Sequence, residues 1–172
     1  MKKYFIIILC SIIIGFIFGI EAFNYVNTHF IYNRTSSLPQ RIFKISGRAD
    51  NHNLIKGDYV SICPIKRKIK PLIDHNLLPR NGYCYNGYNS LLKIVGAIEG
   101  DYVVVDENGI TVNGSLIYGT VAKSKNAEHF KFKGYVPKDH IIVYTHHEKG
   151  FDSRYFGFIS ADELVYLLDP VF

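Results

Sequence analysis

The residue whose chemistry stands out first is Lys93, a lysine inside a strongly apolar stretch. Residues 91–98 read LLKIVGAI, and with the two-residue period of a β-strand both faces of this stretch are apolar. A strand of this kind is buried on both sides, which predicts that Lys93 is buried too. Burial disfavours the charged form of a lysine and lowers its pKa. A neutral amine near pH 7 is a competent general base. The alternative is a lysine whose ammonium group reaches solvent from a sheet edge.

A general base needs a nucleophile, and the candidates are Ser36 and Ser37. Both lie shortly before Pro39, just after the apolar N-terminal stretch. The proline ring fixes its own backbone and disfavours a helical conformation in the residue before it, which holds a neighbouring hydroxyl in a defined turn. Taken alone, however, this segment is an ordinary Ser-Pro loop.

A third cluster of polar groups lies near the C-terminus, in residues 150–157 (GFDSRYFG). Asp152, Ser153 and Arg154 are adjacent there and are framed by glycines and aromatic residues. On its own the pattern indicates a turn held by an Asp–Arg pair.

Other catalytic and metal-binding motifs are missing from the sequence. It contains no phosphate-binding or dinucleotide-binding glycine loop, no G-x-S-x-G elbow and no H-E-x-x-H. His146 and His147 are adjacent, and neighbouring strand residues point to opposite faces, so they cannot easily share a metal ion. One of them with Asp152 offers an alternative Ser–His–Asp hydrolase, which would leave Lys93 without a role.

The elements that must position these residues are predicted to be mainly β-strands. Residues 101–117 contain β-branched runs separated by turns, and Asn113-Gly114 is a strong hairpin signal because both central positions need positive φ. Further strands are expected over residues 59–62 and 140–145. The only helix expected near the C-terminus covers residues 161–168.

The N-terminus is predicted to be a membrane anchor. Residues 5–20 carry no charge, a length at the lower end of what a spanning helix needs. No small-x-small cleavage site follows, so an uncleaved anchor is favoured over a cleaved secretory signal. Lys2 and Lys3 place the N-terminus in the cytoplasm by the positive-inside rule. We therefore expect an anchor over residues 1–23 in the inner membrane and an extracytoplasmic domain over residues 24–172.

The charge of the chain indicates which partners to expect, and its cysteines indicate which cellular compartment the domain occupies. The chain of 172 residues has a net charge of +5, and a basic cluster at residues 66–70 lacks the interleaved aromatics of a single-strand binder. Nucleic acid is therefore not expected as a partner. Cys10 lies in the anchor, whereas Cys63 and Cys84 are the pair in the exported part. In an oxidising compartment they predict one disulfide.

Taken together and in this order, the pieces resemble the signal peptidase I superfamily of membrane-anchored serine proteases. Residues 33–39 (NRTSSLP) resemble the nucleophile block, and residues 57–64 resemble the block after it. Residues 91–101, with 112–114 beyond them, resemble the general-base block. Residues 152–157 resemble the last and most specific block. The closest branch is the TraF-like one, which processes pilin-like substrates in conjugative transfer; its cysteines fall where 63 and 84 stand here.

The resemblance implies a signal-peptidase/LexA-like antiparallel β-sheet domain behind one transmembrane helix, and a Ser–Lys dyad that cleaves leader peptides. Ser37 would be the nucleophile and Lys93 the general base, with Thr35 donating to the oxyanion. Asp152, Ser153 and Arg154 would support the lysine. Substrates would be preproteins or pre-pilins with small residues at −1 and −3, other conjugation components are possible partners, and no metal or organic cofactor is expected.

Two departures from the family pattern and several rival functions stay open at this point. Arg41 stands where the conjugative branch usually has glycine, and Gly150 stands where many relatives have a serine that orients the lysine. The rivals are a housekeeping signal peptidase, a transpeptidase that cyclises a pilin, and a non-catalytic scaffold subunit of a transfer apparatus.

Overall fold

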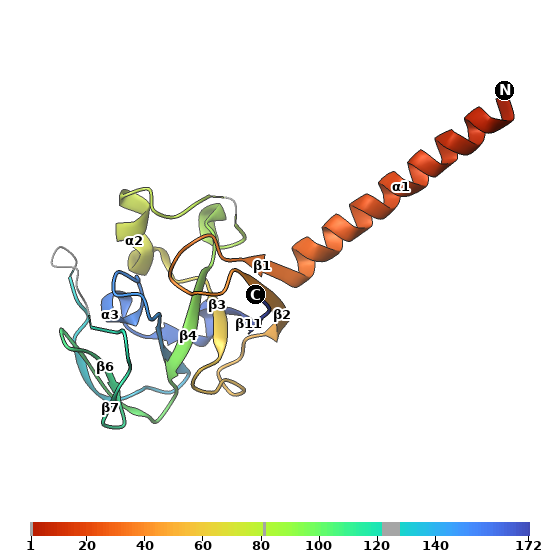
Figure 1. Cartoon of the computed structure of the whole chain (residues 1–172). Coiled ribbons are helices and arrows are strands. Elements are labelled where there is room, and N and C mark those ends of the chain that lie inside the picture. Colours follow the sequence, from red (N-terminus) through yellow and green to blue (C-terminus); the bar gives the residue numbers. More distant parts are fainter. Residues whose placement is uncertain (1, 81, 122–127) are drawn as a thin grey trace.

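The computed structural model describes residues 2–80, 82–121 and 128–172, and it begins with a long helix. Helix α1 (Lys2–His29) projects away from a β domain (Figure 1). It continues beyond position 23, the expected end of the anchor, because neither glycine nor proline interrupts the residues that follow. Its part Ile6–His29 is long and apolar enough to cross a membrane, and no other helix in the described residues is. This arrangement is consistent with a single-pass membrane protein.

The domain after α1 is built from two antiparallel sheets, which confirms the expected mainly β fold. The larger sheet contains, in spatial order, β1 (Phe30–Tyr32), β2 (Ile42–Arg48), β11 (Leu164–Pro170), β3 (Tyr59–Ile62), β4 (Leu91–Ala97), β9 (His140–Tyr144) and β10 (Ile159–Ser160). The smaller sheet contains β7 (Ser115–Leu116), β6 (Gly109–Val112), β5 (Tyr102–Asp106) and β8 (Phe132–Tyr135). The short helix α3 (Ser153–Phe156) follows β9.

Strand β4, which carries Lys93, lies inside the larger sheet between β3 and β9. Val60 of β3 pairs with Lys93, and Ile94 pairs with Tyr144 of β9. Every residue of β4 after Leu91 is buried. The prediction that this strand is buried on both faces is therefore confirmed, and it places the lysine away from any sheet edge.

The smaller sheet forms through the turns that the sequence predicts. Val112 pairs with Ser115, and the two residues between them, Asn113 and Gly114, have φ values of 49° and 83°. Asparagine and glycine tolerate this left-handed backbone better than other residues, so the turn specifies the register of the hairpin.

The helix expected over residues 161–168 is wrong. Ala161–Glu163 form a single 3-10 turn, and the residues that follow form β11. This strand pairs with β2 on one side and with β3 on the other. Hydrogen bonding to two neighbours inside the sheet outweighs the weak helix propensity of so short a segment.

The basic cluster at residues 66–70, for which we predicted no helix, begins helix α2 (Lys66–Asp74). The helix belongs to a segment that leaves the sheet after β3 and returns at β4. Lys68 pairs with the buried Glu163, whose carboxylate also accepts the N–H of Ile65 at 2.9 Å. The segment is thus attached to the turn before β11 by a partly buried ion pair as well as by the chain itself.

The expected disulfide closes this same segment, with the Cα atoms of Cys63 and Cys84 5.4 Å apart. A small core forms beside the disulfide from Ile69 and Leu78, inside the closed loop, and from Tyr88, just after it. The cross-link therefore holds a compact unit against one end of the larger sheet.

We expect the double variant Cys63→Ser/Cys84→Ser to lose about 3 kcal/mol of unfolding free energy, because the unfolded chain gains loop entropy. Urea unfolding in detergent, followed by circular dichroism, measures the change. Cys10→Ser is the matched control, since Cys10 is a free, exposed cysteine. An unchanged midpoint in the double variant would contradict a stabilising role.

Candidate active site

The loop of residues 33–40, which we call the nucleophile loop, joins β1 to β2 and is organised by Asn33. This buried side chain donates to the carbonyls of Leu38 (3.1 Å) and Gln40 (3.0 Å). Its own carbonyl oxygen accepts from the N–H (3.1 Å) and the hydroxyl (2.9 Å) of Thr35. Four hydrogen bonds to one buried amide fix the loop. Our sequence reasoning missed this role, although an asparagine that bonds the backbone two residues on is a known turn signal.

Ser37 is half-buried in this loop and lies against Thr35. The two hydroxyl oxygens are 2.6 Å apart, and the N–H of Ser37 points to Thr35 Oγ1 at 3.4 Å. Since Thr35 donates its own proton to Asn33, Ser37 is the donor in the short hydroxyl pair. The next residue, Leu38, is buried in an apolar cluster with Phe43. The predicted nucleophile and the predicted oxyanion donor are therefore neighbours on an anchored loop.

Arg41 is the first departure from the family pattern, and it holds the nucleophile loop through hydrogen bonds to backbone carbonyls. Its guanidinium donates to the carbonyl of Thr35 at 3.3 Å, and its backbone N–H donates to the carbonyl of Phe172 at 2.6 Å. The arginine thus connects the loop to the C-terminus of the chain.

Lys93 is 3% exposed, and its amine makes no hydrogen bond within the described part of the chain. Burial lowers the pKa of Lys93 to about 8. The negative charge of Asp152 opposes this fall, and the positive charge of Arg154 adds to it. A substantial fraction of the amine is therefore neutral at mildly basic pH, as a general base requires.

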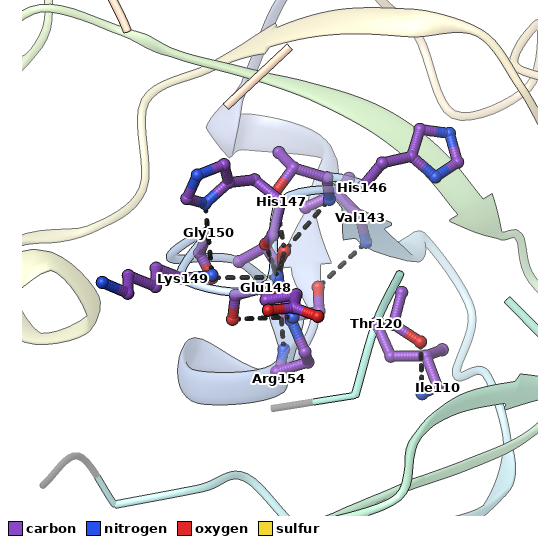
Figure 2. Close-up of polar contacts among 12 residues, drawn as sticks. Ile110, Thr120, Val143, His146, His147, Glu148, Lys149, Gly150 and Arg154 are labelled. Atoms are coloured by element: carbon purple, nitrogen blue, oxygen red, sulfur yellow. Dashed lines mark hydrogen bonds and ion pairs between the residues drawn. The ribbon is translucent and has the colours of Figure 1, made fainter. Parts of the chain in front are cut away.

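Asp152 and Arg154 form a fully buried ion pair, and the charges of both residues act on Lys93. The guanidinium reaches both carboxylate oxygens, at 2.8 and 2.7 Å. It also donates to the carbonyls of His147 and Gly150 (Figure 2). Ser153 adds a link to β9, because its hydroxyl accepts the N–H of Val143 at 2.9 Å. The predicted supporting residues thus hold one another and the loop after β9 in place.

Gly150, the second departure, stands where the hydroxyl of Thr145 leaves no room for a side chain. A Cβ atom at position 150 would lie 1.9 Å from Thr145 Oγ1. Thr145 is fully buried, and its N–H and hydroxyl reach Asp152 Oδ2 at 3.0 and 3.3 Å. Continuing the β4–β9 register places Thr145 opposite Lys93. Sequence reasoning missed Thr145, since only the cross-strand register brings it to the site.

Ser37 and Lys93 line one cleft of about 750 Å³, together with Thr35 and Gly150. The two residues are not hydrogen-bonded to each other within the described part of the chain. The cleft is bounded by the nucleophile loop, by the start of β4 and by the disulfide-closed segment. The structure therefore brings the predicted nucleophile and base to one concave surface with room for an extended peptide.

The alternative Ser–His–Asp arrangement is not formed by the described residues. The carboxylate of Asp152 is taken up by Arg154 and Thr145. His146 Nδ1 contacts the carbonyl of Tyr118 at 3.1 Å, and His147 Nδ1 accepts the N–H of Lys149. Among the described residues there is also no cluster of three or more His, Cys, Asp or Glu side chains that could hold a metal ion.

Comparison with known proteins gives related results at three levels. The chain is 25% identical over 146 residues to the plasmid transfer protein TraF of Escherichia coli, covering 81% of this chain and 80% of that protein. It is 30% identical over 120 residues to the conjugal transfer protein TraF of Agrobacterium tumefaciens, covering 67% and 68%. A signal peptidase I structure from Enterococcus faecalis aligns at a TM-score of 0.41 and 19% identity, over 68% of this chain and 97% of that one. The family model for signal peptidase, peptidase S26, matches residues 1–169, and the chain belongs to that family.

Proposed function

We propose that this protein is a membrane-anchored serine endopeptidase that removes leader peptides from exported preproteins. The observation that carries the proposal is the shared cleft: a half-buried serine and a buried lysine of lowered pKa line the same concave surface. A lysine kept partly neutral serves no structural purpose that an apolar residue would not serve better. Membership in the signal peptidase family supports the same activity.

In the proposed reaction, neutral Lys93 accepts the proton of Ser37 while Ser37 Oγ attacks the scissile carbonyl carbon. The carbonyl oxygen becomes an oxyanion. The N–H of Ser37 and the hydroxyl of Thr35 stabilise it after they turn from Thr35 Oγ1 and Asn33 Oδ1, their partners in the free loop, an effect of about 2.7–4 kcal/mol per donor. When the carbon–nitrogen bond breaks, protonated Lys93 returns its proton to the leaving amine. Water activated by Lys93 then hydrolyses the acyl-enzyme and frees Ser37.

The relatives named as TraF support a substrate from a conjugative transfer system, such as a pre-pilin with small residues at −1 and −3. We place α1 in the inner membrane with its N-terminus in the cytoplasm, because Lys2 and Lys3 precede the apolar run. The disulfide fits a domain on the oxidising, periplasmic side.

We expect Ser37→Ala and Lys93→Met each to reduce cleavage of a co-encoded pre-pilin in membranes by on the order of 10⁴-fold or more, since each removes one half of the dyad. Mass spectrometry of the product measures this. Ser36→Ala is the matched control, because Ser36 is the exposed neighbour of the nucleophile and should leave cleavage unchanged.

The same experiment separates the rival functions. Full processing by Ser37→Ala or Lys93→Met would refute the dyad. A product lighter than the hydrolysed one by a single water would identify cyclisation by a substrate amine, whereas no cleavage by the wild type would favour a scaffold. Cleavage of general secretory preproteins in preference to pre-pilin would identify a housekeeping peptidase.

The pH dependence of cleavage should report Lys93 directly. Because only the neutral amine is a base, kcat/KM is expected to rise with pH through about 8 and to level off above it. Steady-state assays on a peptide substrate measure the profile between about pH 6 and about pH 10, which is roughly two pH units on each side of that pKa. A profile that keeps rising through pH 10 would contradict a lowered pKa.

Lys93→Met should stabilise the protein while it abolishes activity. The folded pKa of about 8 lies below the ordinary 10.5, so the unfolded state binds more protons between these values and stability rises with pH across that window. Below pH 8 the burial of charged Lys93 lowers the free energy of unfolding by its full amount, about 3 kcal/mol. We expect Lys93→Met to unfold at higher urea than the wild type at pH 7, with a smaller gain at pH 10. Equal or lower stability at pH 7 would contradict the penalty.

A further inference from the structure

The segment between Cys63 and Cys84 supplies one wall of the cleft that contains Ser37 and Lys93. We call the cleft-lining residues of this segment the tethered wall: they are Leu72, Leu77, Leu78, Pro79, Gly82 and Tyr83. Neither the dyad nor its supporting residues come from this wall. It therefore has no part in the proposed chemistry, and its effect is on what can bind.

Tyr83, a residue of the tethered wall, is held to the larger sheet by its hydroxyl and by its ring. Its hydroxyl lies 2.6 Å from Ser61 Oγ on β3, and it donates to Ser90 Oγ at 2.8 Å. Its ring meets the ring of Tyr166 on β11 edge to face, with centroids 5.7 Å apart. A ring held by groups from two strands and from the run into β4 cannot swing aside without losing these contacts.

The backbone on both sides of Tyr83 is fixed as well. The N–H groups of Gly82 and Cys84 donate to the carbonyls of Gly87 (2.9 Å) and Tyr88 (3.0 Å). A Cβ atom at position 82 would lie 2.3 Å from the carbonyl oxygen of Tyr88, so only glycine fits there. The disulfide follows directly at Cys84. The backbone that carries the ring is thus held by hydrogen bonds on both sides and by the disulfide.

The contacts of Tyr83 place its ring beside the strand that carries Lys93, because its partner Ser61 pairs with Leu92. Ser90, its hydrogen-bond partner, is followed by Leu91 and Leu92, which line the cleft and lead directly to Lys93. The side chain of Tyr83 is 54% exposed, and it lines the same cleft. A peptide that lies in the cleft must place a side chain against this ring or stop short of it.

We propose that Tyr83 is a specificity-determining residue, whose fixed ring limits the size of one substrate side chain bound near the Ser37–Lys93 pair. The inference rests on the proposed peptidase function and adds to it the residue of this chain that selects a small side chain. The substrate class is an extended peptide with a small residue at the position that meets the ring.

The test uses the full chain in detergent and synthetic peptides that span the cleavage site of the co-encoded pre-pilin. In each peptide one residue before the scissile bond is replaced by alanine or by leucine. For each position, the ratio of kcat/KM for the alanine peptide to that for the leucine peptide measures size discrimination. In Tyr83→Ala we expect this ratio to fall by about tenfold or more at one position and to stay unchanged at the others.

Three further variants separate ring size from other effects. Tyr83→Phe keeps the ring without its hydroxyl and should retain the discrimination of the wild type within about threefold. Tyr85→Ala is the matched control, because Tyr85 is an exposed tyrosine just after the disulfide, two residues beyond Tyr83, and does not line the cleft. If Tyr83→Ala does not fold, Tyr83→Leu replaces the ring by a smaller aliphatic side chain with less loss of apolar contact and should give the same change.

An unchanged ratio at every position in Tyr83→Ala or Tyr83→Leu would overturn the proposal, and so would an equal loss of kcat/KM for all peptides. Such outcomes leave the peptidase function standing, because the wild type still cleaves. If the wild type cleaves none of the peptides, or if Ser37→Ala cleaves them equally well, the proposed function fails and the role of Tyr83 fails with it.

Discussion

Every other feature of the candidate site depends on the burial of one amine inside the larger sheet. Lys93 lies on β4 between β3 and β9, where desolvation penalises its charged form. A free carboxylate beside it would restore the charge, since ion pairs are strong in a poorly solvated interior. Asp152, the carboxylate whose charge acts on Lys93, is instead bound by Arg154 on both oxygens and by Thr145. The buried ion pair therefore leaves desolvation as the larger effect, so the pKa of Lys93 falls to about 8.

The rest of the domain presents a hydroxyl and a binding surface to that amine. Asn33 closes the nucleophile loop from inside, and the apolar anchor Leu38 holds it on the sheet next to Ser37. On the other side of the cleft, the disulfide and the Lys68–Glu163 pair hold a small separate core against the same sheet. The nucleophile loop and the disulfide-closed segment are thus held separately, and both line the cleft that contains Ser37 and Lys93. Rigid walls are what a site needs when the substrate is a flexible, extended peptide.

The sequence was informative where local pattern decides structure and misleading where long-range pairing does. The apolar run around Lys93 predicted a buried strand, and the Asn113-Gly114 turn predicted the hairpin of β6 and β7. Both predictions were possible because strand period and turn chemistry are local properties of the sequence. Residues 161–168 form a strand rather than a helix because two neighbouring strands pair with them. Helix α2 was missed because its first residues are a basic cluster typical of a loop. The roles of Asn33 and Thr145 come from hydrogen bonds and a strand register that only the folded chain defines.

The measurement that tests the central claim most directly is an NMR titration of Lys93 in the full chain. Lysine labelled at Cε with ¹³C gives one signal per side chain, and the signal missing from Lys93→Met assigns Lys93. A midpoint near pH 8, well below that of the exposed lysines, is the predicted result. A midpoint at the ordinary value of 10.5 would show a lysine that stays charged even at mildly basic pH, and it would contradict the account of Lys93 as a neutral base.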